Sequence, residues 1–427
     1  MTSSSSTQAA AGFECIAAES IGANKCVAIT KLVEGTFNKT FHLKMDNSST
    51  AIARIPQPIA GPKYYTTASE ITTIDFAHTV LQIPALQVHT WSACADNPVG
   101  AEYIIMEEAT GTKLEDIWDN LSLEDRIGIM KDLVLIENKL LSVSFSRYGN
   151  LYYSGKAVPG AVVAEVKWIE QYTIPKPATD QFITSTVQNS SEAHLSLLKK
   201  YLQVAPYLLP TDDPNLITST IWHTDLHASN LFVDKGHITS VIDWQEAWTG
   251  PLVLQGHHPH LVDYQGDIIL EPPPNFKDLE LNEKAQLKKQ IASSIILYLY
   301  EQQTAKLNPN LNRVLHLKLG RVRCEPISFV SNTWDDDILP LHELLINVER
   351  ITISIMDSGP PLGLCLLSCG GLTGVQYSWC SIPSPRLSCV LECTAAIMKP
   401  VFNRSVKAFN SHGIPKETSR IDATLHL

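Results

Sequence analysis

Short runs of apolar and β-branched residues, separated by turn residues, mark the first quarter of the chain. They fall at residues 27–33, 39–45, 50–55, 86–91 and 102–106. Runs of this length between Gly, Pro, Asn and Asp are typical of β-strands. Residues 65–81, between the third and fourth runs, predict a helix. We therefore expect a small strand-rich lobe over residues 25–107.

Helical periodicity dominates the predicted second lobe, residues 108–357. Apolar residues recur at helical spacing behind Ser122, which forms with Asp125 the capping box that begins many helices. Further helices are expected at 191–204 and 282–305, and two short apolar runs, 231–233 and 238–242, suit a β-hairpin. The order of elements predicts an α+β fold of two lobes with a link near residues 107–111, a natural place for a nucleotide.

The two ends of the chain differ from the rest. Residues 1–24 are rich in Ser and Ala and predict a disordered N-terminal arm. Residues 358–427 form a divergent tail in which no helical or alternating pattern persists, and we expect it to add no ordered core. Its pairs Cys365/Cys369 and Cys389/Cys393 have no nearby His, which disfavours a zinc site.

Composition excludes several classes of protein. The formal net charge is −11 and no long basic run occurs, which argues against nucleic-acid binding. No segment reaches the roughly 20 apolar residues of a membrane-spanning helix. The N-terminal residues contain neither a presequence nor a secretory signal, so we expect a cytosolic protein or a chain lacking its original start. The nine cysteines are unevenly spread, which favours reduced thiols.

The segment that carries chemistry is IWHTDLHASNLFV, residues 221–233, followed by VIDW. It combines His-x-Asp-x4-Asn with a hairpin and a second Asp, the arrangement that kinases and their relatives use for phosphoryl transfer. Carboxylate and carboxamide oxygens are hard ligands that suit Mg²⁺. Asp243 would be the main metal ligand and Asn230 the second, while Asp225 would accept the proton of the attacking hydroxyl.

The same segment has a second interpretation. A lone Asp or Asn in a loop is usually a turn residue or a helix cap. Here two motifs stand in the required order, and the hairpin between them brings Asn230 and Asp243 together. His223 would brace the loop by hydrogen bonds. The pattern as a whole favours phosphoryl transfer.

These two segments resemble those of the aminoglycoside/choline-kinase-type phosphotransferases, which share the protein-kinase fold. KLVEGTFNKTFHLKM, GAEYIIMEEATG and DWQEAWTGPLVLQGHHPHLVDY resemble the fungal altered-inheritance-of-mitochondria phosphotransferase-like proteins. The likeness runs from about residue 26 to about residue 357. It implies a bilobal protein-kinase-like fold, ATP and Mg²⁺ as cofactors, and a mitochondrial location, with the cytoplasm as the alternative.

The resemblance also assigns residues of the small lobe. Gly35 would belong to the loop that covers the phosphates, although its single glycine also suits an ordinary hairpin. Arg54 would take the place of the lysine that grips the α- and β-phosphates. Its alternative is a strand residue whose charge reaches solvent. The backbone of Glu107 and Ala109, in the link at 106–109, would read adenine.

Glu70 would orient Arg54 through an ion pair. The alternative is that residues 67–70, Thr-Ala-Ser-Glu, form a capping box for their own helix. The segment Gly-His-His-Pro-His, residues 256–260, has no partner spaced for zinc, and we expect a loop near or under the acceptor pocket instead.

Two functions follow from these assignments. The first is an ATP-dependent phosphotransferase that acts on a hydroxyl of a small-molecule acceptor. The second is a pseudokinase that binds nucleotide, or only a partner, and serves as a regulatory scaffold. Arg54 and the single loop glycine favour the second, whereas the intact set of Asp225, Asn230 and Asp243 favours the first.

Overall fold

The computed structural model describes residues 3–32, 35, 37–57, 60–61, 63–153, 162–165, 191–210, 213–330 and 339–356. The chain forms two compact units. The first comprises Met1–Ile169 and Thr218–His316, and the second comprises Glu170–Ile217 and Leu317–Leu427. The predicted tail 358–427, with its cysteine pairs, lies outside the described residues.

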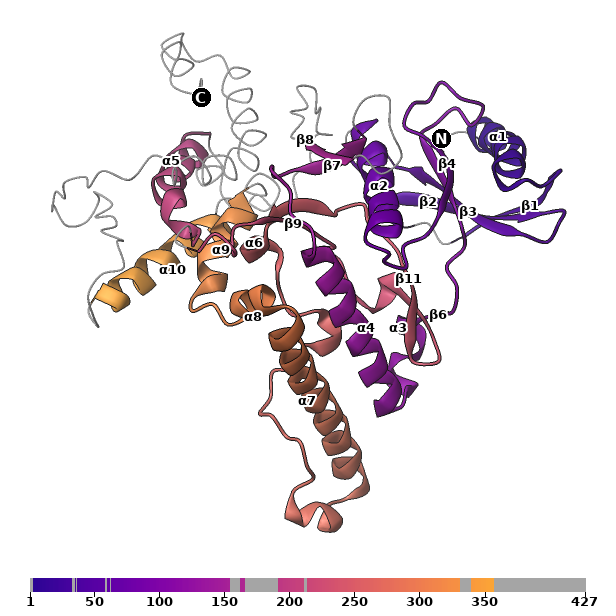
Figure 1. Ribbon diagram of the computed structural model, residues 1–427. Coiled ribbons are helices and arrows are strands. Elements are labelled where there is room, and N and C mark those ends of the chain that lie inside the picture. Colours follow the sequence, from indigo (N-terminus) through magenta and orange to yellow (C-terminus); the bar gives the residue numbers. More distant parts are fainter. Residues whose placement is uncertain are drawn as a thin grey trace, which may run out of the picture. The chain divides into compact units, whose positions relative to one another are not determined.

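The first unit begins with an antiparallel sheet of five strands, which confirms the strands expected over residues 25–107 (Figure 1). Its order is β1-β2-β3-β5-β4. The strands are β1 Cys26–Lys31, β2 Asn38–Met45, β3 Thr50–Pro56, β4 Val88–Ser92 and β5 Tyr103–Met106. The expected helix is present as α2 Tyr65–Asp75, followed by a π-helical turn at Phe76–Val80. In the register, Arg54 of β3 lies between Thr40 of β2 and Ile104 of β5.

The two faces of this sheet are covered by different helices. Because side chains alternate along a strand, Tyr103 and Ile105 point to one face and Ile104 and Met106 to the other. The first pair packs in a cluster with helix α1 Ser3–Ile21. The second pair packs with Ile71 of α2. The same alternation along β3 puts Arg54 on the face that α2 covers, and this decides its partner.

Helix α1 corrects the prediction of a disordered arm over residues 1–24. Phe13 is 1% exposed and stands edge-on to Tyr103, with ring centroids 5.9 Å apart. Gly12 allows the close approach, since a Cβ there would lie 2.6 Å from the carbonyl oxygen of Pro98. Ala is the best helix former, and Ala17 is fully buried against the sheet. The Ser/Ala composition therefore marks a packed helix.

The rest of the first unit contains several short strands and two long helices. The hairpin predicted at 231–242 is present, and the hydroxyl of Ser122 caps α4 by accepting from the N–H of Asp125, as predicted. The strands are β6 Thr112–Lys113, β7 Asn150–Tyr153, β8 Val162–Glu165, β9 Ser219–Trp222, β10 Leu231–Asp234, β11 His237–Val241 and β12 Trp248–Pro251. The helices are α3 Leu114–Ile117, α4 Leu123–Leu141, α6 Leu252–Gln255, α7 Leu281–Leu307 and α8 Pro309–Leu315.

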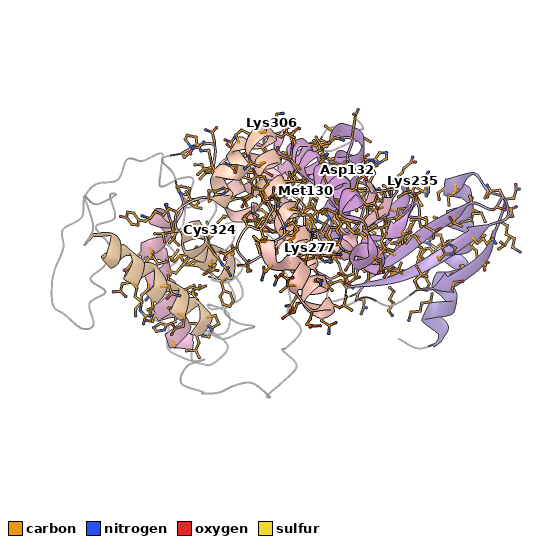
Figure 2. The ribbon with its side chains drawn as sticks, turned by 90° about the horizontal axis from the view of Figure 1, so that it is seen from below. Met130, Asp132, Lys235, Lys277, Lys306 and Cys324 are labelled. Carbon is orange, nitrogen blue, oxygen red and sulfur yellow. The ribbon has the colours of Figure 1, made fainter. Side chains whose placement is uncertain are left out.

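Helix α4 lies between the hairpin and α7, and holds the hairpin in place with one of its faces. Asp132 of α4 accepts from the N–H of Ile238 at 2.9 Å and pairs with His237 at 3.0 Å. Figure 2 labels Asp132 and, at the turn of the hairpin, Lys235. The opposite face of α4 packs against α7 around Met130. The hairpin that carries the candidate site thus stands on a helical base.

A buried carboxyl group lies between α4 and α7. Glu137 is fully buried, and the hydroxyl of Tyr300 is 3.1 Å from both of its carboxylate oxygens. Burial raises the pKa of Glu137 to about 8, and the hydrogen bond from Tyr300 opposes this rise. No cation is paired with Glu137 within the described ranges. The group is therefore mostly protonated in the folded protein at pH 7.

This raised pKa predicts a pH dependence of stability. The unfolded chain releases the Glu137 proton near its ordinary pKa of 4.5 and the folded chain only near 8. Stability is therefore greatest below the unfolded pKa and falls as pH rises towards the folded one, by up to about 1.4 kcal/mol per pH unit. Glu137→Gln should flatten the change in melting temperature between pH 5 and pH 8.

The readout is the change in melting temperature with pH and not the melting temperature itself. Burying the glutamine amide changes stability by the same amount at both pH values, so it does not affect this slope. Glu124→Gln, at an exposed position at the start of the same helix, is the matched control and should keep the wild-type slope. Equal slopes for Glu137→Gln and wild type would contradict the assignment.

The second unit contains three described helices, α5 Ser191–Leu208, α9 Gly320–Phe329 and α10 Leu339–Met356. Helix α9 packs against both of the others. Arg323 of α9 donates to the carbonyl oxygens of Leu208 and Tyr207 at 2.9 and 3.3 Å, and so caps the C-terminal end of α5. Among the helices that the structure describes, none is long and apolar enough to cross a membrane.

Candidate functional site

The loop between β9 and β10 is held by His223. This side chain is 2% exposed, and its Nε2 lies 2.9 Å from the carbonyl oxygen of Ile242, which can only accept. The proton therefore resides on Nε2, and Nδ1 accepts from the N–H of Asp225 at 3.3 Å. Burial lowers the pKa of His223, which keeps the ring neutral in this role. The bracing role predicted for His223 is confirmed.

Asp225 is held by two side-chain donors. The amide nitrogen Nδ2 of Asn230 donates to its Oδ2 at 3.0 Å and to its backbone oxygen at 2.9 Å. The Nε2 of His227 lies 3.1 Å from Oδ1. Because His227 Nδ1 accepts from the N–H of Ser229 at 3.1 Å, the His227 proton faces Asp225. The carboxylate is half exposed, so it is oriented and still accessible to a substrate.

The hairpin places Asp243 beside this loop. The N–H of Ile242 donates to the carbonyl oxygen of Asn230 at 3.0 Å, which ties the two ends of the hairpin together. Asp243 itself has φ +63°, in the left-handed region. A non-glycine residue pays on the order of 1 kcal/mol for this conformation, which recurs at functional sites.

One oxygen of Asp243 has no hydrogen-bond partner among the described residues. This atom, Oδ1, is buried, and its neighbouring charge is the guanidinium of Arg54, 3.7 Å away. A buried carboxylate oxygen that accepts no hydrogen bond is unfavourable and suits a cation. The oxygen donors of Asp243 and Asn230 fit a hard ion such as Mg²⁺, which takes few protein ligands and completes its shell with phosphate and water. Elsewhere in the described part of the chain, no group of three or more His, Cys, Asp or Glu side chains is placed to hold a metal ion.

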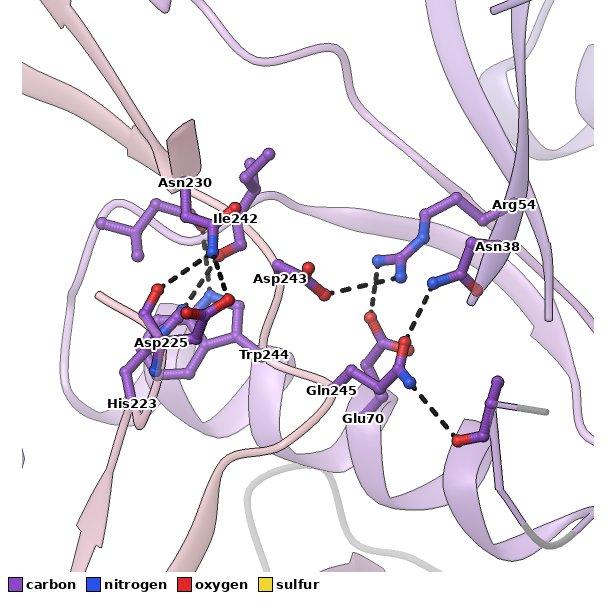
Figure 3. Close-up of polar contacts among 12 residues, drawn as sticks. Asn38, Arg54, Glu70, His223, Asp225, Asn230, Ile242, Asp243, Trp244 and Gln245 are labelled. Carbon is purple, nitrogen blue, oxygen red and sulfur yellow. Dashed lines mark hydrogen bonds and ion pairs between the residues drawn. The ribbon is translucent and has the colours of Figure 1, made fainter. Parts of the chain in front are cut away.

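Arg54 joins the two lobes at this point (Figure 3). Its Nη1 donates to Oε1 of Glu70 at 2.6 Å, and its Nη2 lies 3.7 Å from Oδ1 of Asp243, too far for a hydrogen bond. Burial raises the pKa of Glu70, and the guanidinium of Arg54 counteracts this rise. The pairing of Arg54 with Glu70 is as predicted.

Two alternative interpretations are wrong. Arg54 does not extend into bulk solvent, since its side chain is only 11% exposed and its guanidinium faces Glu70 and Asp243. Glu70 does not cap its helix, because α2 begins at Tyr65 and Thr67 lies inside it. The hydroxyl of Thr67 donates instead to Glu102 at 2.8 Å.

A pocket of about 550 Å³ lies beneath the sheet and beside the hairpin. This volume is within the range of small-molecule sites. Of the predicted residues, the pocket is lined by Gly35, Arg54, Ala109, Asn230 and Asp243. Its apolar lining includes Ile52, Leu86, Met106, Phe232 and Val241. Glu70 does not line the pocket but holds Arg54, and Asp225 borders it through its contact with Asn230.

The link between the lobes places its two predicted residues differently. Ala109 lines the pocket, and no described residue hydrogen-bonds to it. Glu107 is engaged elsewhere, because its N–H donates to the oxygen of Gln87 at 2.9 Å and its carboxylate accepts from the N–H of Gln87 at 2.8 Å. Of the two predicted adenine contacts, Ala109 therefore has the better position.

Three polar residues near the site, Asn38, Gln245 and Glu246, were not identified from the sequence. Gln245 accepts from Asn38 of β2 at 2.9 Å, and Asn38 lines the pocket. The pKa of Glu246 is raised by partial burial and by the charges of Asp225 and Asp243. Gln245 and Glu246 directly follow the Asp243-Trp244 pair, and this closeness in sequence could have marked them as residues near the site. Closeness in sequence does not show that Gln245 contacts Asn38 on the other side of the site.

The histidine segment 256–260 has a structural partner. His258 Nε2 lies 3.3 Å from Oε1 of Glu301 in α7, and its ring packs against Tyr300 with centroids 5.9 Å apart. His316 Nε2 lies 3.9 Å from the same Glu301 oxygen. The segment is thus anchored on α7, beside the helical base of the first unit.

Comparison with known proteins identifies a matching family and several relatives. The model of the family described as "Phosphotransferase enzyme family" matches residues 28–254. A subtelomeric hrmA-associated cluster protein of Aspergillus fumigatus is 27% identical, over 77% of this chain and 80% of its own length. The Yarrowia lipolytica protein named altered inheritance of mitochondria protein 9, mitochondrial, is 24% identical, over 78% of this chain and 68% of its own.

A solved structure also aligns with the chain. It is a thermostable mutant of aminoglycoside phosphotransferase APH(4)-Ia in a ternary complex with AMP-PNP and hygromycin B. It is 15% identical, with a TM-score of 0.40, and the alignment covers 79% of this chain and 98% of the other.

Proposed function

Because the family model spans more than half of its residues, the chain belongs to the phosphotransferase enzyme family, and we propose that it transfers the γ-phosphate of ATP to a hydroxyl of a small-molecule acceptor. One observation carries the proposal. Asp243, whose Oδ1 has no hydrogen-bond partner among the described residues, lines the same pocket as Asn230 and Arg54, next to an oriented and accessible Asp225. An oriented base, oxygen ligands and a guanidinium around one pocket are the parts that phosphoryl transfer requires.

In this proposal each side chain has one task. Asp225 accepts the proton of the acceptor hydroxyl while the hydroxyl oxygen forms a bond to the γ-phosphorus. The bond between the γ-phosphorus and the bridging oxygen breaks, and ADP leaves with that oxygen. Asn230 and His227 hold the two oxygens of that carboxylate in place. Arg54, kept in position by Glu70, binds phosphate oxygens. The backbone of Ala109 and the apolar lining hold the adenine ring.

Asp243 and Asn230 are the residues that would hold Mg²⁺, which when bound neutralises phosphate charge. Without it, Asp243 has only the guanidinium of Arg54 as a neighbouring positive charge, 3.7 Å away. Two carboxylates, Glu70 and Asp243, thus share one Arg54 in the described site. Mg²⁺ would supply the second positive charge.

A nucleotide-binding regulatory protein is the second candidate. The shared position of Arg54 between Glu70 and Asp243 favours it, because a planar guanidinium is not equivalent to the compact lysine ammonium. A mitochondrial location is part of the proposal as well, supported by the names of relatives such as the Yarrowia lipolytica protein.

The test measures binding first and transfer second. Mg-ATP should raise the melting temperature of the wild-type protein, and ATP with EDTA should raise it less. Asp243→Ala should lose the magnesium-dependent part, because it removes the carboxylate whose Oδ1 has no hydrogen-bond partner in the described site. A panel of hydroxyl-bearing metabolites with γ-labelled ATP then identifies the acceptor.

Each result decides between the candidates. Label transfer to a metabolite supports the enzyme. Binding of Mg-ATP without transfer to any hydroxyl supports the regulatory protein. If Mg-ATP leaves the melting temperature unchanged, both proposals fail.

A further inference from the structure

Gln245 crosses from the metal-ligand loop to the sheet. It lies two residues after Asp243, and its side chain contacts Asn38 of β2 (Figure 3) and the backbone that follows β3. Its Nε2 donates to the carbonyl oxygen of Ala60, after β3, at 3.4 Å. Since that carbonyl can only accept, Oε1 of Gln245 faces Asn38, whose Nδ2 donates to it at 2.9 Å. The contacts therefore define one orientation of both amides.

Both ends of this contact are anchored. On the loop side, the carbonyl oxygen of neighbouring Glu246 accepts from the hydroxyl of Thr224, 3.3 Å away in the catalytic loop. On the sheet side, the carbonyl oxygen of Asn38 accepts from the N–H of Gly35 at 3.1 Å. Gln57, at the end of β3, donates from Nε2 to the carbonyl oxygen of Gly35 at 2.9 Å. A short chain of hydrogen bonds thus connects the catalytic loop to Gly35.

We propose that Gln245 is a positioning residue that holds Asn38, and through it Gly35, over the phosphate end of the pocket, in register with Asp243. The proposal rests on the proposed ATP-binding function and adds a residue to it. Gly35, Asn38 and Asp243 all line the pocket, whereas Gln245 does not. Gln245 therefore acts on the nucleotide through the residues that it holds.

The direction of the effect follows from the pocket. With the Asn38–Gln245 contact formed, the pocket still measures about 550 Å³, so the contact leaves space for a small-molecule ligand. It fixes Asn38 and Gly35 before the nucleotide arrives, and a preformed site loses less conformational freedom on binding. Breaking the contact should therefore weaken binding of Mg-ATP. The net strength of one hydrogen bond corresponds to a loss of about five-fold.

The experiment has one readout that needs no nucleotide. In the ligand-free protein, hydrogen exchange of the amides at residues 35 and 37–39 should be about five-fold faster in Gln245→Ala than in wild type. Gln265→Ala is the matched control, because Gln265 is exposed and donates to Asp263. It should exchange as wild type does.

The second readout is the affinity for Mg-ATP by calorimetry. Gln245→Ala should bind about five-fold more weakly, and Asn38→Ala,Gln245→Ala no more weakly than the weaker single variant, because the two residues act as one contact. Additive losses would overturn the proposal.

The remaining outcomes separate this proposal from the function on which it rests. Unchanged exchange in Gln245→Ala overturns the contact itself, whatever the protein binds. Faster exchange with unchanged affinity overturns the positioning role. A wild-type protein that binds no Mg-ATP overturns the proposed function, and the positioning role with it.

Discussion

Asp225→Asn should lower the rate of phosphate transfer by about 10²–10⁴-fold, the usual contribution of a general base, while Mg-ATP still binds. An amide of the same shape cannot accept the hydroxyl proton. It also cannot satisfy both neighbours, because Asn230 Nδ2 and the protonated Nε2 of His227 both donate to the carboxylate. One lost hydrogen bond should reduce stability by about 1 kcal/mol, a small loss beside the loss of rate.

The measurement is single-turnover transfer of γ-labelled phosphate to the acceptor found in the metabolite panel, with Mg-ATP affinity determined in parallel. Asp234→Asn is the matched control, since Asp234 lies on the same hairpin with its side chain 61% exposed and near Lys235. It should transfer at the wild-type rate. Wild-type transfer by Asp225→Asn would remove Asp225 from the role of base.

The central part of the site could be predicted because its geometry is local. Asn230 directly precedes strand β10 and Asp243 closely follows β11, so any hairpin over residues 231–241 must bring them together. The carbonyl of Asn230 and the N–H of Ile242 complete that hairpin. The α+β fold was predictable for a similar reason, since short β-branched runs and long helical periodicities follow one another in separate parts of the chain.

The failed prediction of a disordered arm has a physical cause. Composition reports the average polarity of residues 1–24, whereas the stability of α1 depends on a few contacts that composition does not record. Phe13 and Ala17 are buried against the sheet, and Gly12 admits the backbone of Pro98 and Val99. These contacts link residues more than 80 positions apart, and no local pattern reveals them.

The same limit applies to the contacts that cross the site. Asn38 and Gln245 are separated by 207 residues, and neither stands in a motif that names the other. Arg54 and Glu70 could be paired in advance only through the resemblance to a family. The competing capping-box interpretation was excluded by a single fact, namely that α2 begins at Tyr65, ahead of Thr67.

Arg54→Ala should have the largest effect on stability, because it leaves Glu70 buried without a partner. The two side chains are 11% and 4% exposed, and removing one member of a buried ion pair typically costs about 3–5 kcal/mol. The variant should also lose affinity for Mg-ATP, since the pocket loses a guanidinium. Melting temperature and calorimetric affinity measure the two effects. Lys289→Ala is the control, because its ion pair with Asp119 is exposed and should contribute little.

A double variant separates stability from binding. Arg54→Met,Glu70→Met replaces the pair with apolar side chains, an exchange that is often neutral or stabilising for a buried ion pair. It should recover most of the stability lost in Arg54→Ala but none of the affinity for Mg-ATP, because a thioether cannot neutralise phosphate. If the double variant bound Mg-ATP as wild type does, Arg54 would serve only to compensate Glu70. Retained affinity in Arg54→Lys, together with its loss in the double variant, would place the positive charge itself on the phosphates.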